Sequence, residues 1–489
     1  MGLILSLVSG CEKEPSALNP PQEDVSTSDA LGPVAERRDA LRVESTEDAD
    51  TEREVSEELP LPTPDSKLYA GFAEAPLAFP IGSPAVGYGP KQGPKTPYAE
   101  SYPGTNAEHT KLKAKAMVLR AANKTLALVR VDLIGIWQGM VRDAQARLRE
   151  RGHPELAKGL IVAATHTHRS GGRIFDHFIG EIAVGPFLEG FYPRVRDAIV
   201  EAAIEAATQA IPARIGHTSM QVPSLHSDRR CEHNPSQDDT LGILKVESRE
   251  GELMGVVLNY AMHGTVLGNE EFVLSTDAPG AMEDGLEASM QSPAMVLYLQ
   301  SWAGDMAPES PDSHAIQAGH DLRDSYKELR AIAAEAAALV EPVIAATPTK
   351  EDVKVDVVTI ALPLNNALIN PEGSFDAYPH GGIYCMDSAE NCGDAAEAFV
   401  DAQLTCVPIP EEYSVPWTLL SAAQVGELVL VTLPGEPSTS IGSELRQRAL
   451  EATGLDEVFV VGYSQSYLSY LLHPEDYWMG GYEGASALM

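Results

Sequence analysis

From Leu68 onward, short apolar segments alternate with amphipathic ones, and this alternation constrains the fold more than any other feature of the chain. Short continuous apolar runs are typical of buried strands, and apolar residues three or four positions apart are typical of helices. The pair Asn123-Lys124 separates two strand-like runs and predicts a hairpin turn. Because no regular strand–helix–strand repeat is visible, we expect one large domain of mixed α/β (α+β) class. The predicted strands span 116–120, 125–131, 160–164, 241–246, 255–260, 294–300 and 427–433, and the predicted helices span 140–151, 195–210, 322–340 and 437–453.

The first part of the chain has a different composition. Residues 12–67 are rich in Glu, Asp, Ser, Thr and Pro and contain no aromatic residue, which predicts a disordered acidic tether. Before it, a short apolar run at 3–8 leads through Ser9-Gly10 to Cys11, a pattern that resembles a bacterial lipoprotein signal. We therefore expect a signal peptide at 1–10, a lipid-carrying cysteine and linker at 11–67, and a folded domain at 68–489. The protein would be exported and anchored to the membrane at the bacterial cell envelope, or secreted; the alternative is a chance cysteine.

Charge and cysteine content narrow the possible functions further. A formal net charge of -36 argues against nucleic-acid binding, which needs clustered Lys and Arg. No stretch approaches the roughly 20 apolar residues that span a bilayer. The remaining cysteines are an even number, which is compatible with disulfides in an exported protein, and no CxxC pair supports a zinc ribbon. These cysteines are Cys231, Cys385, Cys392 and Cys406, of which Cys385 and Cys392 could close one short loop.

Polar clusters follow several of the predicted strands, where side chains can converge on a shared cleft. His166 and His168 come directly after the strand at 160–164, and two residues at i and i+2 of an extended chain point to the same side. Histidine is a frequent zinc ligand. Taken alone, however, this pair is better explained as two ordinary loop histidines.

The other clusters are equally ambiguous when taken singly. His263 follows the strand at 255–260, and Glu436 lies between the strand at 427–433 and a predicted helix, where the helix dipole favours a carboxylate. The segment 300–308 resembles a plain surface turn, and the tyrosines near the C-terminus could be core residues.

The order of these clusters resembles the neutral/alkaline non-lysosomal ceramidase family from about Ala70 to the C-terminus. That family's catalytic domain is a zinc hydrolase that cleaves the amide of N-acylsphingosine, or ceramide, with a zinc-activated water. The resemblance therefore implies Zn²⁺ as cofactor, a ceramide-like lipid as substrate and no protein partner. The matching motifs are GSPAVGYG at 82–89, ATHTHRSGG at 164–172, DTLGILKV at 239–246, MHGTV at 262–266, STD at 275–277, LPGEP at 433–437 and YEGAS at 482–486.

The resemblance also assigns roles to individual residues. The implied zinc ligands are His166, His263, Glu436 and Tyr470. His168 would transfer a proton at the reacting amide, and Tyr482 would donate a hydrogen bond to the developing oxyanion. An arginine of the family corresponds to Arg230 or its neighbour Arg229.

Three departures from the family pattern leave alternatives open. Ala307 stands where the family has a serine proposed to act as nucleophile or to orient the substrate, and Arg169 stands where a serine usually follows the second histidine. The chain also ends at Met489, without the immunoglobulin-like domain that usually follows. The alternatives are a zinc hydrolase of a non-sphingolipid amide or ester, and a catalytically impaired lipid-binding surface protein.

Overall fold

The computed structural model describes residues 67–88, 92–100, 102–230, 238–309, 322–364, 382–383, 407–408, 415–478, 481–485 and 487. The chain divides into two units, Met1–Glu58 and Leu59–Met489, and every described residue belongs to the second. The predicted signal peptide, nearly all of the tether and all five cysteines lie outside the described residues. Among the helices that are described, none is both long and apolar enough to cross a membrane.

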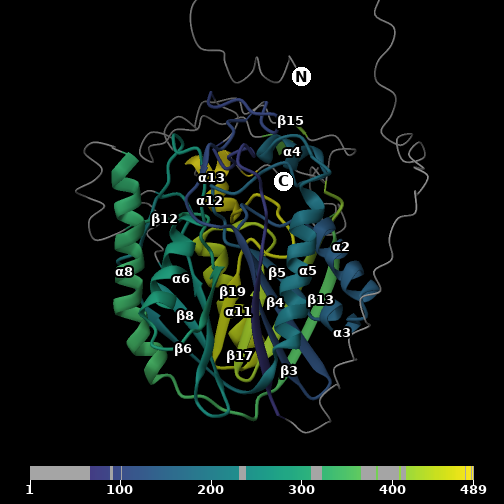
Figure 1. The fold of residues 1–489 in the computed structure, drawn as a ribbon, viewed down its shortest axis with the longest axis vertical. Helices are drawn as coiled ribbons and strands as arrows, with labels where there is room; N and C mark the ends of the chain where they lie inside the picture. The colour runs from purple at the N-terminus through teal and green to yellow at the C-terminus, as the bar shows by residue number, and fades with distance from the viewer. Residues whose placement is uncertain are drawn as a thin grey trace, which may run out of the picture. The chain divides into compact units, whose positions relative to one another are not determined.

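A mixed sheet of eight strands forms the centre of the molecule (Figure 1). Strands β1 and β6 pair only at their first residues, through Tyr69↔Pro212 and Ala70↔Ile211. The sheet therefore has two halves that join at one corner. In sheet order, the strands are β11 (Met295–Gln300), β9 (Leu253–Tyr260), β8 (Thr240–Ser248), β6 (Ile211–Gln221), β1 (Tyr69–Pro76), β3 (Lys113–Ala121), β4 (Lys124–Val131) and β5 (Leu160–Ala164).

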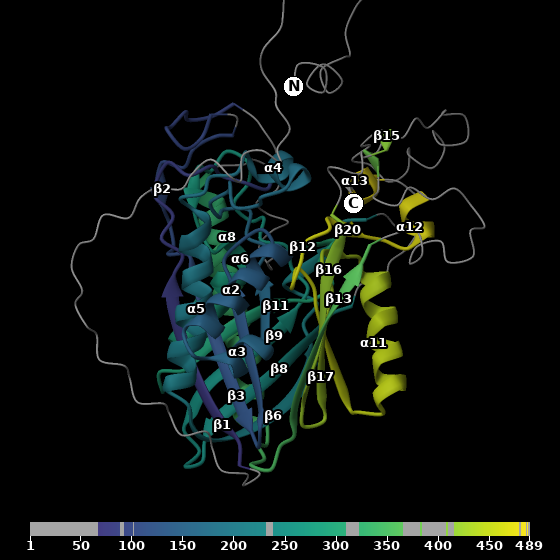
Figure 2. The same cartoon turned by 90° about the vertical axis from the view of Figure 1, so that its right-hand side faces the viewer.

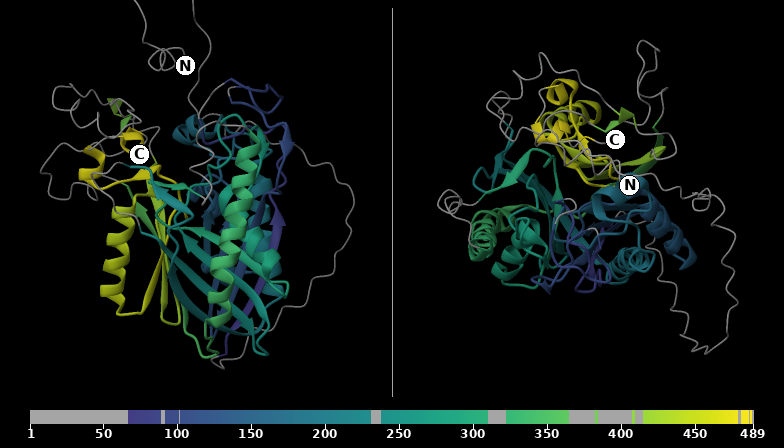
Figure 3. Two further views of the ribbon diagram at one scale, coloured as in Figure 1. Left: turned by 90° about the vertical axis from the view of Figure 1, so that its left-hand side faces the viewer. Right: turned by 90° about the horizontal axis from the view of Figure 1, so that it is seen from above.

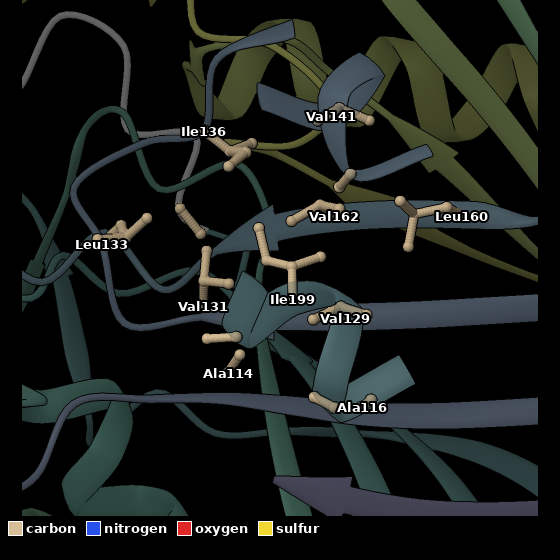
Figure 4. Packing of buried hydrophobic residues seen from close by; sticks show 14 of the residues in the cluster. Ala114, Ala116, Val129, Val131, Leu133, Ile136, Val141, Leu160, Val162 and Ile199 are labelled. Carbon is tan, nitrogen blue, oxygen red and sulfur yellow. The ribbon is translucent and has the colours of Figure 1, made fainter. Parts of the chain in front are cut away.

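Helices cover the outer face of both halves (Figures 1 and 3). The half that holds β5 packs on α2 (Gln138–Glu150), α3 (Pro154–Lys158) and α5 (Tyr192–Thr208). Figure 4 shows this packing, in which Ile199 of α5 and Val141 of α2 lie against apolar side chains of the strands. The half that holds β11 packs on α6 (Asp277–Ser289) and α8 (Leu322–Ala346).

A second sheet packs on the inner face of the first (Figure 2). Close contact between the two sheets requires glycine at one point: a Cβ atom on Gly242 would lie 2.3 Å from the ring of Phe459. Helix α11 (Thr439–Thr453) covers the opposite face of the second sheet (Figure 2). In sheet order, the strands are β13 (Val355–Pro363), β16 (Trp417–Val425), β17 (Leu428–Thr432) and β19 (Glu457–Val461).

The mixed α/β class and the predicted elements are confirmed, with one correction. The predicted hairpin is β3–β4, and Ala122 takes a positive φ of 51° in its turn. The helix predicted to begin at Pro437 begins at Thr439, because Glu436–Pro437 form the short strand β18, which pairs in parallel with β20 (Tyr470–Leu471). Strands β1, β6, β13, β16 and β19 were not predicted.

A network of buried charges joins α6 to the large sheet. The Glu283 carboxylate is 1% exposed and forms ion pairs with Lys115, at 2.9 Å, and with Arg130. Arg130 also pairs with Asp132 at 2.7 Å. When one partner of a buried ion pair is removed, the desolvation of the remaining charge is no longer offset, and the folded state is destabilised.

The Glu283→Ala substitution should therefore lower the free energy of unfolding by about 3–5 kcal/mol, because it leaves Arg130 and Lys115 short of a counter-charge. Urea denaturation measures this quantity. The control is Glu74→Ala, which removes one partner of the exposed Lys113–Glu74 pair and should cost less than about 1 kcal/mol. An equal decrease in the free energy of unfolding of Glu283→Ala and Glu74→Ala would contradict the prediction.

Candidate metal centre

The two histidine motifs lie on loops that run side by side. The loop after β5 and the loop after β9 form a parallel bridge between Thr167 and Gly264, and the His168 N–H donates to the Gly264 carbonyl at 3.0 Å. A Cβ atom on Gly264 would lie 2.7 Å from the carbonyl oxygen of His166, so glycine is required for this approach. The backbone of His166 has a φ of +61°, a conformation that is rare outside glycine and often found at functional sites.

Four buried side chains converge beside these loops. Nε2 of His166 lies 3.0 Å from Nε2 of His168 and 3.2 Å from Oε2 of Glu436. The same Glu436 oxygen lies 3.3 Å from Nε2 of His263. The histidine ligand atoms all lie within 4.8 Å of one another. The structure thus brings together His166, His168, His263 and Glu436, four of the residues to which the resemblance assigned roles.

The hydrogen bonds behind the cluster determine which atoms face it. Nδ1 of His166 donates to the Ile134 carbonyl at 2.6 Å, and Nδ1 of His263 donates to the Ala303 carbonyl at 2.5 Å. A neutral imidazole has only one N–H group, so in the neutral form each ring directs an unprotonated Nε2 toward Glu436. Among the described residues, Nε2 of His263 and Oε2 of Glu436 have no hydrogen-bond partner.

This arrangement fits a metal ion. Nε2 of His263 and Oε2 of Glu436 face each other without a hydrogen bond, an arrangement that is unfavourable in a buried place unless a cation lies between them. Two ligands of a tetrahedral zinc ion are about 3.3 Å apart, close to the observed separations of 3.2 and 3.3 Å. His166, His263 and Glu436 could therefore hold a metal ion of the kind that imidazole and carboxylate ligands select.

The electrostatics of the cluster support the same conclusion. Burial, followed by the charges of Arg229 and His166, lowers the pKa of His263 to about 3. Burial likewise holds the pKa of His168 well below its usual value. Burial alone would raise the pKa of Glu436, but His166 and His263 outweigh it and hold that pKa well below the usual range. At neutral pH the low pKa values leave the rings of His263 and His168 neutral and the Glu436 carboxylate charged, and these are the forms in which such groups bind metals.

Two tyrosines support this centre from neighbouring positions. Tyr470, a predicted ligand, lies beside Glu436 through the β18–β20 pairing, and its hydroxyl accepts a hydrogen bond from Arg229 at 2.9 Å. Tyr467 has no predicted role, yet its hydroxyl donates to Oε1 of Glu436. In the sequence, Tyr467 stands out only because it lies three residues before Tyr470. This spacing does not reveal its hydrogen bond to Glu436.

The arginine prediction needs a correction. Arg230, the arginine predicted for the site, pairs with Asp476 at 3.4 Å. Arg229 is the residue that reaches Tyr470, and it also donates to Glu483 at 2.8 Å. Both arginines lie near Glu483, with Arg230 at 4.0 Å, but of the two it is Arg229 that also reaches the Tyr470 hydroxyl.

The remaining predicted residues lie around the centre. The Tyr482 ring is 48% exposed and lies 5.8 Å from the ring of Tyr470. Ala307 lies in β12 (Met306–Pro308) opposite Ser227 of β7 (His226–Asp228). Arg169 is fully buried and donates to the Leu267 carbonyl at 3.1 and 3.2 Å.

The segment 300–308 is not the surface turn that it resembles. Gln300, Trp302 and Asp305 are buried. Asp305 accepts hydrogen bonds from the backbone N–H and the hydroxyl of Thr439, at the start of α11. Burial raises the pKa of Asp305 to about 6.

Removal of the Tyr467 hydroxyl should weaken metal binding. Because this hydroxyl orients Glu436, we expect Tyr467→Phe to lower the affinity for Zn²⁺ by about 10–100-fold in a chelator competition titration. The matched control is Tyr463→Phe. The Tyr463 ring lies 4.2 Å from the ring of His166, but its hydroxyl has no hydrogen-bond partner among the described residues, so affinity should stay unchanged. An equal loss of Zn²⁺ affinity in Tyr467→Phe and Tyr463→Phe would refute the role of Tyr467 in orienting Glu436.

Comparison with known proteins agrees with this site. Residues 96–351 match the family described as neutral/alkaline non-lysosomal ceramidase, N-terminal. The chain is 23% identical to a neutral ceramidase of Mycobacterium tuberculosis over 80% of its own length and 70% of that protein. It is 24% identical to a neutral ceramidase of Pseudomonas aeruginosa over 78% of its length and 64% of that protein.

Solved structures share the fold. The crystal structure of neutral ceramidase from Pseudomonas aeruginosa superposes with a TM-score of 0.70 at 21% identity, over 87% of this chain and 71% of that chain. A ceramidase complexed with C2 superposes with a TM-score of 0.72 at 20% identity, over 87% of this chain and 72% of that chain. Because the family match covers more than half of the chain, the protein belongs to the neutral/alkaline non-lysosomal ceramidase family.

Proposed function

We propose that this protein is a zinc-dependent hydrolase that cleaves the amide bond of ceramide or a related N-acyl lipid. The observation that carries the proposal is the buried cluster in which Nε2 of His166 and Nε2 of His263 converge on Glu436. Its occurrence in a member of a ceramidase family supports an amide as the substrate. The relatives named neutral ceramidase support the same substrate class.

Zinc is the proposed metal, and His166, His263 and Glu436 would hold it, with Tyr470 completing the set. When bound there, zinc supplies Lewis-acid polarisation of an amide carbonyl and makes a water molecule more acidic. Imidazole and carboxylate ligands suit this ion.

The other residues of the site would move protons and stabilise charge. His168 is neutral at pH 7 and lies 3.0 Å from His166, so it can accept a proton and then deliver it to the departing amine. Tyr482 would donate a hydrogen bond to the oxygen of the developing tetrahedral intermediate. Arg229 holds the hydroxyl of Tyr470 in place.

Ala307 bears on how the amide is cleaved. A methyl side chain cannot attack a carbonyl, so an acyl intermediate on this residue is excluded. The proposed reaction is therefore direct attack of water on the amide carbon, with cleavage of the C–N bond to give a fatty acid and an amine.

A second candidate function keeps the chemistry and changes the substrate to a non-sphingolipid amide or ester. The observation that favours it is Arg169, which follows His168 directly. Its guanidinium group is buried, and Nη1 has no hydrogen-bond partner among the described residues. Turnover of small acyl amides or esters, with none of ceramide, would select this alternative.

The test is fatty-acid release from detergent-solubilised ceramide by the zinc-loaded protein. We expect release that a chelator abolishes and that Glu436→Ala lowers by at least about 100-fold, because the carboxylate is central to the cluster. The control Glu74→Ala changes an exposed carboxylate and should leave the rate unchanged. Full activity in Glu436→Ala, or release that persists in chelator, would refute the proposal.

We also propose that the protein is exported and carries a lipid on Cys11. The apolar run before Cys11 and the acidic composition after it support the proposal. In a bacterial host, the full chain should incorporate labelled palmitate and partition with membranes, whereas Cys11→Ser should do neither. Equal labelling of the two chains would exclude an anchor at this residue.

A further inference from the structure

Gln300 is the last residue of β11, and its side chain is fully buried between the two loops that carry the metal-binding histidines. Thr165 directly precedes His166, and Met262 directly precedes His263. The amide group of Gln300 contacts both of these preceding residues. No motif in the sequence indicated a role for this glutamine.

The hydrogen bonds of Gln300 link one loop to the other. Nε2 donates to the carbonyl of Thr165 at 2.9 Å and to the carbonyl of Met262. Oε1 accepts from the backbone N–H of Met262 at 3.2 Å. Because two carbonyls require the NH₂ group and one N–H group requires the oxygen, these partners determine how the amide is oriented.

These contacts place the histidines between two cross-links. On one side, Gln300 joins the residues before His166 and His263. On the other side, the bridge between Thr167 and Gly264 joins the residues after them. The separation of the two imidazoles is therefore set on both sides, and only the first link depends on a side chain.

We propose that Gln300 is a positioning residue that sets the spacing of His166 and His263 for metal binding. It acts through the backbone of Thr165 and Met262. The proposal rests on the metal site of the proposed function and adds a residue that determines the affinity of that site.

The test compares Gln300→Met with Asn259→Leu. Gln300→Met keeps the length of the side chain and removes its hydrogen bonds. Asn259 is a matched control, since its buried amide donates to the Val460 carbonyl at 2.9 Å and to the Leu299 carbonyl at 3.4 Å. These bonds link the two sheets and do not involve either histidine loop, so both variants lose buried amide hydrogen bonds.

The readouts are the Zn²⁺ dissociation constant, from competition with a chelator, and the visible absorption spectrum of Co²⁺ in the same site. We expect Gln300→Met to weaken Zn²⁺ binding by about 10–100-fold and to alter the Co²⁺ spectrum. Asn259→Leu should lower the melting temperature and leave both metal readouts unchanged. Should Gln300→Met fail to fold, the milder Gln300→Asn keeps an amide, and its expected loss of affinity is smaller but in the same direction.

The outcomes separate this inference from the proposed function. Wild-type affinity and spectrum in the folded Gln300 variant would overturn the inference, and so would equal losses in both variants. A wild-type protein that binds Zn²⁺ but hydrolyses no amide would overturn the proposed function and leave the role of Gln300 intact. A wild-type protein that binds no Zn²⁺ would overturn both.

Discussion

Nε2 of His166, Nε2 of His263 and Oε2 of Glu436 face one another in a buried space, and the surrounding structure is arranged to hold them there. Such atoms repel unless a cation lies between them, so the fold must supply restraint from several directions. Carbonyls of Ile134 and Ala303 orient the two rings, and Tyr467 orients the carboxylate. This restraint would hold the three atoms in place for a metal ion.

The restraint depends on elements that are far apart in the sequence. The histidines come from loops after β5 and β9, in opposite halves of the large sheet, whereas Glu436 comes from β18, which follows β17 of the second sheet. These parts meet because the large sheet turns at the β1–β6 corner and the second sheet packs on its inner face. The buried charges around Arg130 extend this support, since Asp132 accepts a hydrogen bond from Thr165, next to His166.

Most of the site was predicted from the resemblance to the ceramidase family, since the apolar pattern shows only that these residues follow strands. His166, His168, His263 and Glu436 each come directly after such a segment, and the structure brings all four together. Tyr467 and Gln300 could not be predicted, because their roles depend on which atoms lie across from them after folding. The sequence likewise could not decide which of Arg229 and Arg230 reaches the site. The two side chains are chemically identical and differ only in the partners that they contact after folding.

The sequence by itself determined the mixed α/β class, the main strands and helices, and the residue types able to bind a metal, because apolar periodicity and side-chain chemistry are local properties. Only the tertiary structure decided which of these residues meet and in which protonation state they do so. The segment 300–308 shows the difference: it resembles a surface turn, yet Gln300, Trp302 and Asp305 are buried. Burial and long-range hydrogen bonds are produced by packing between distant segments, which no local pattern records.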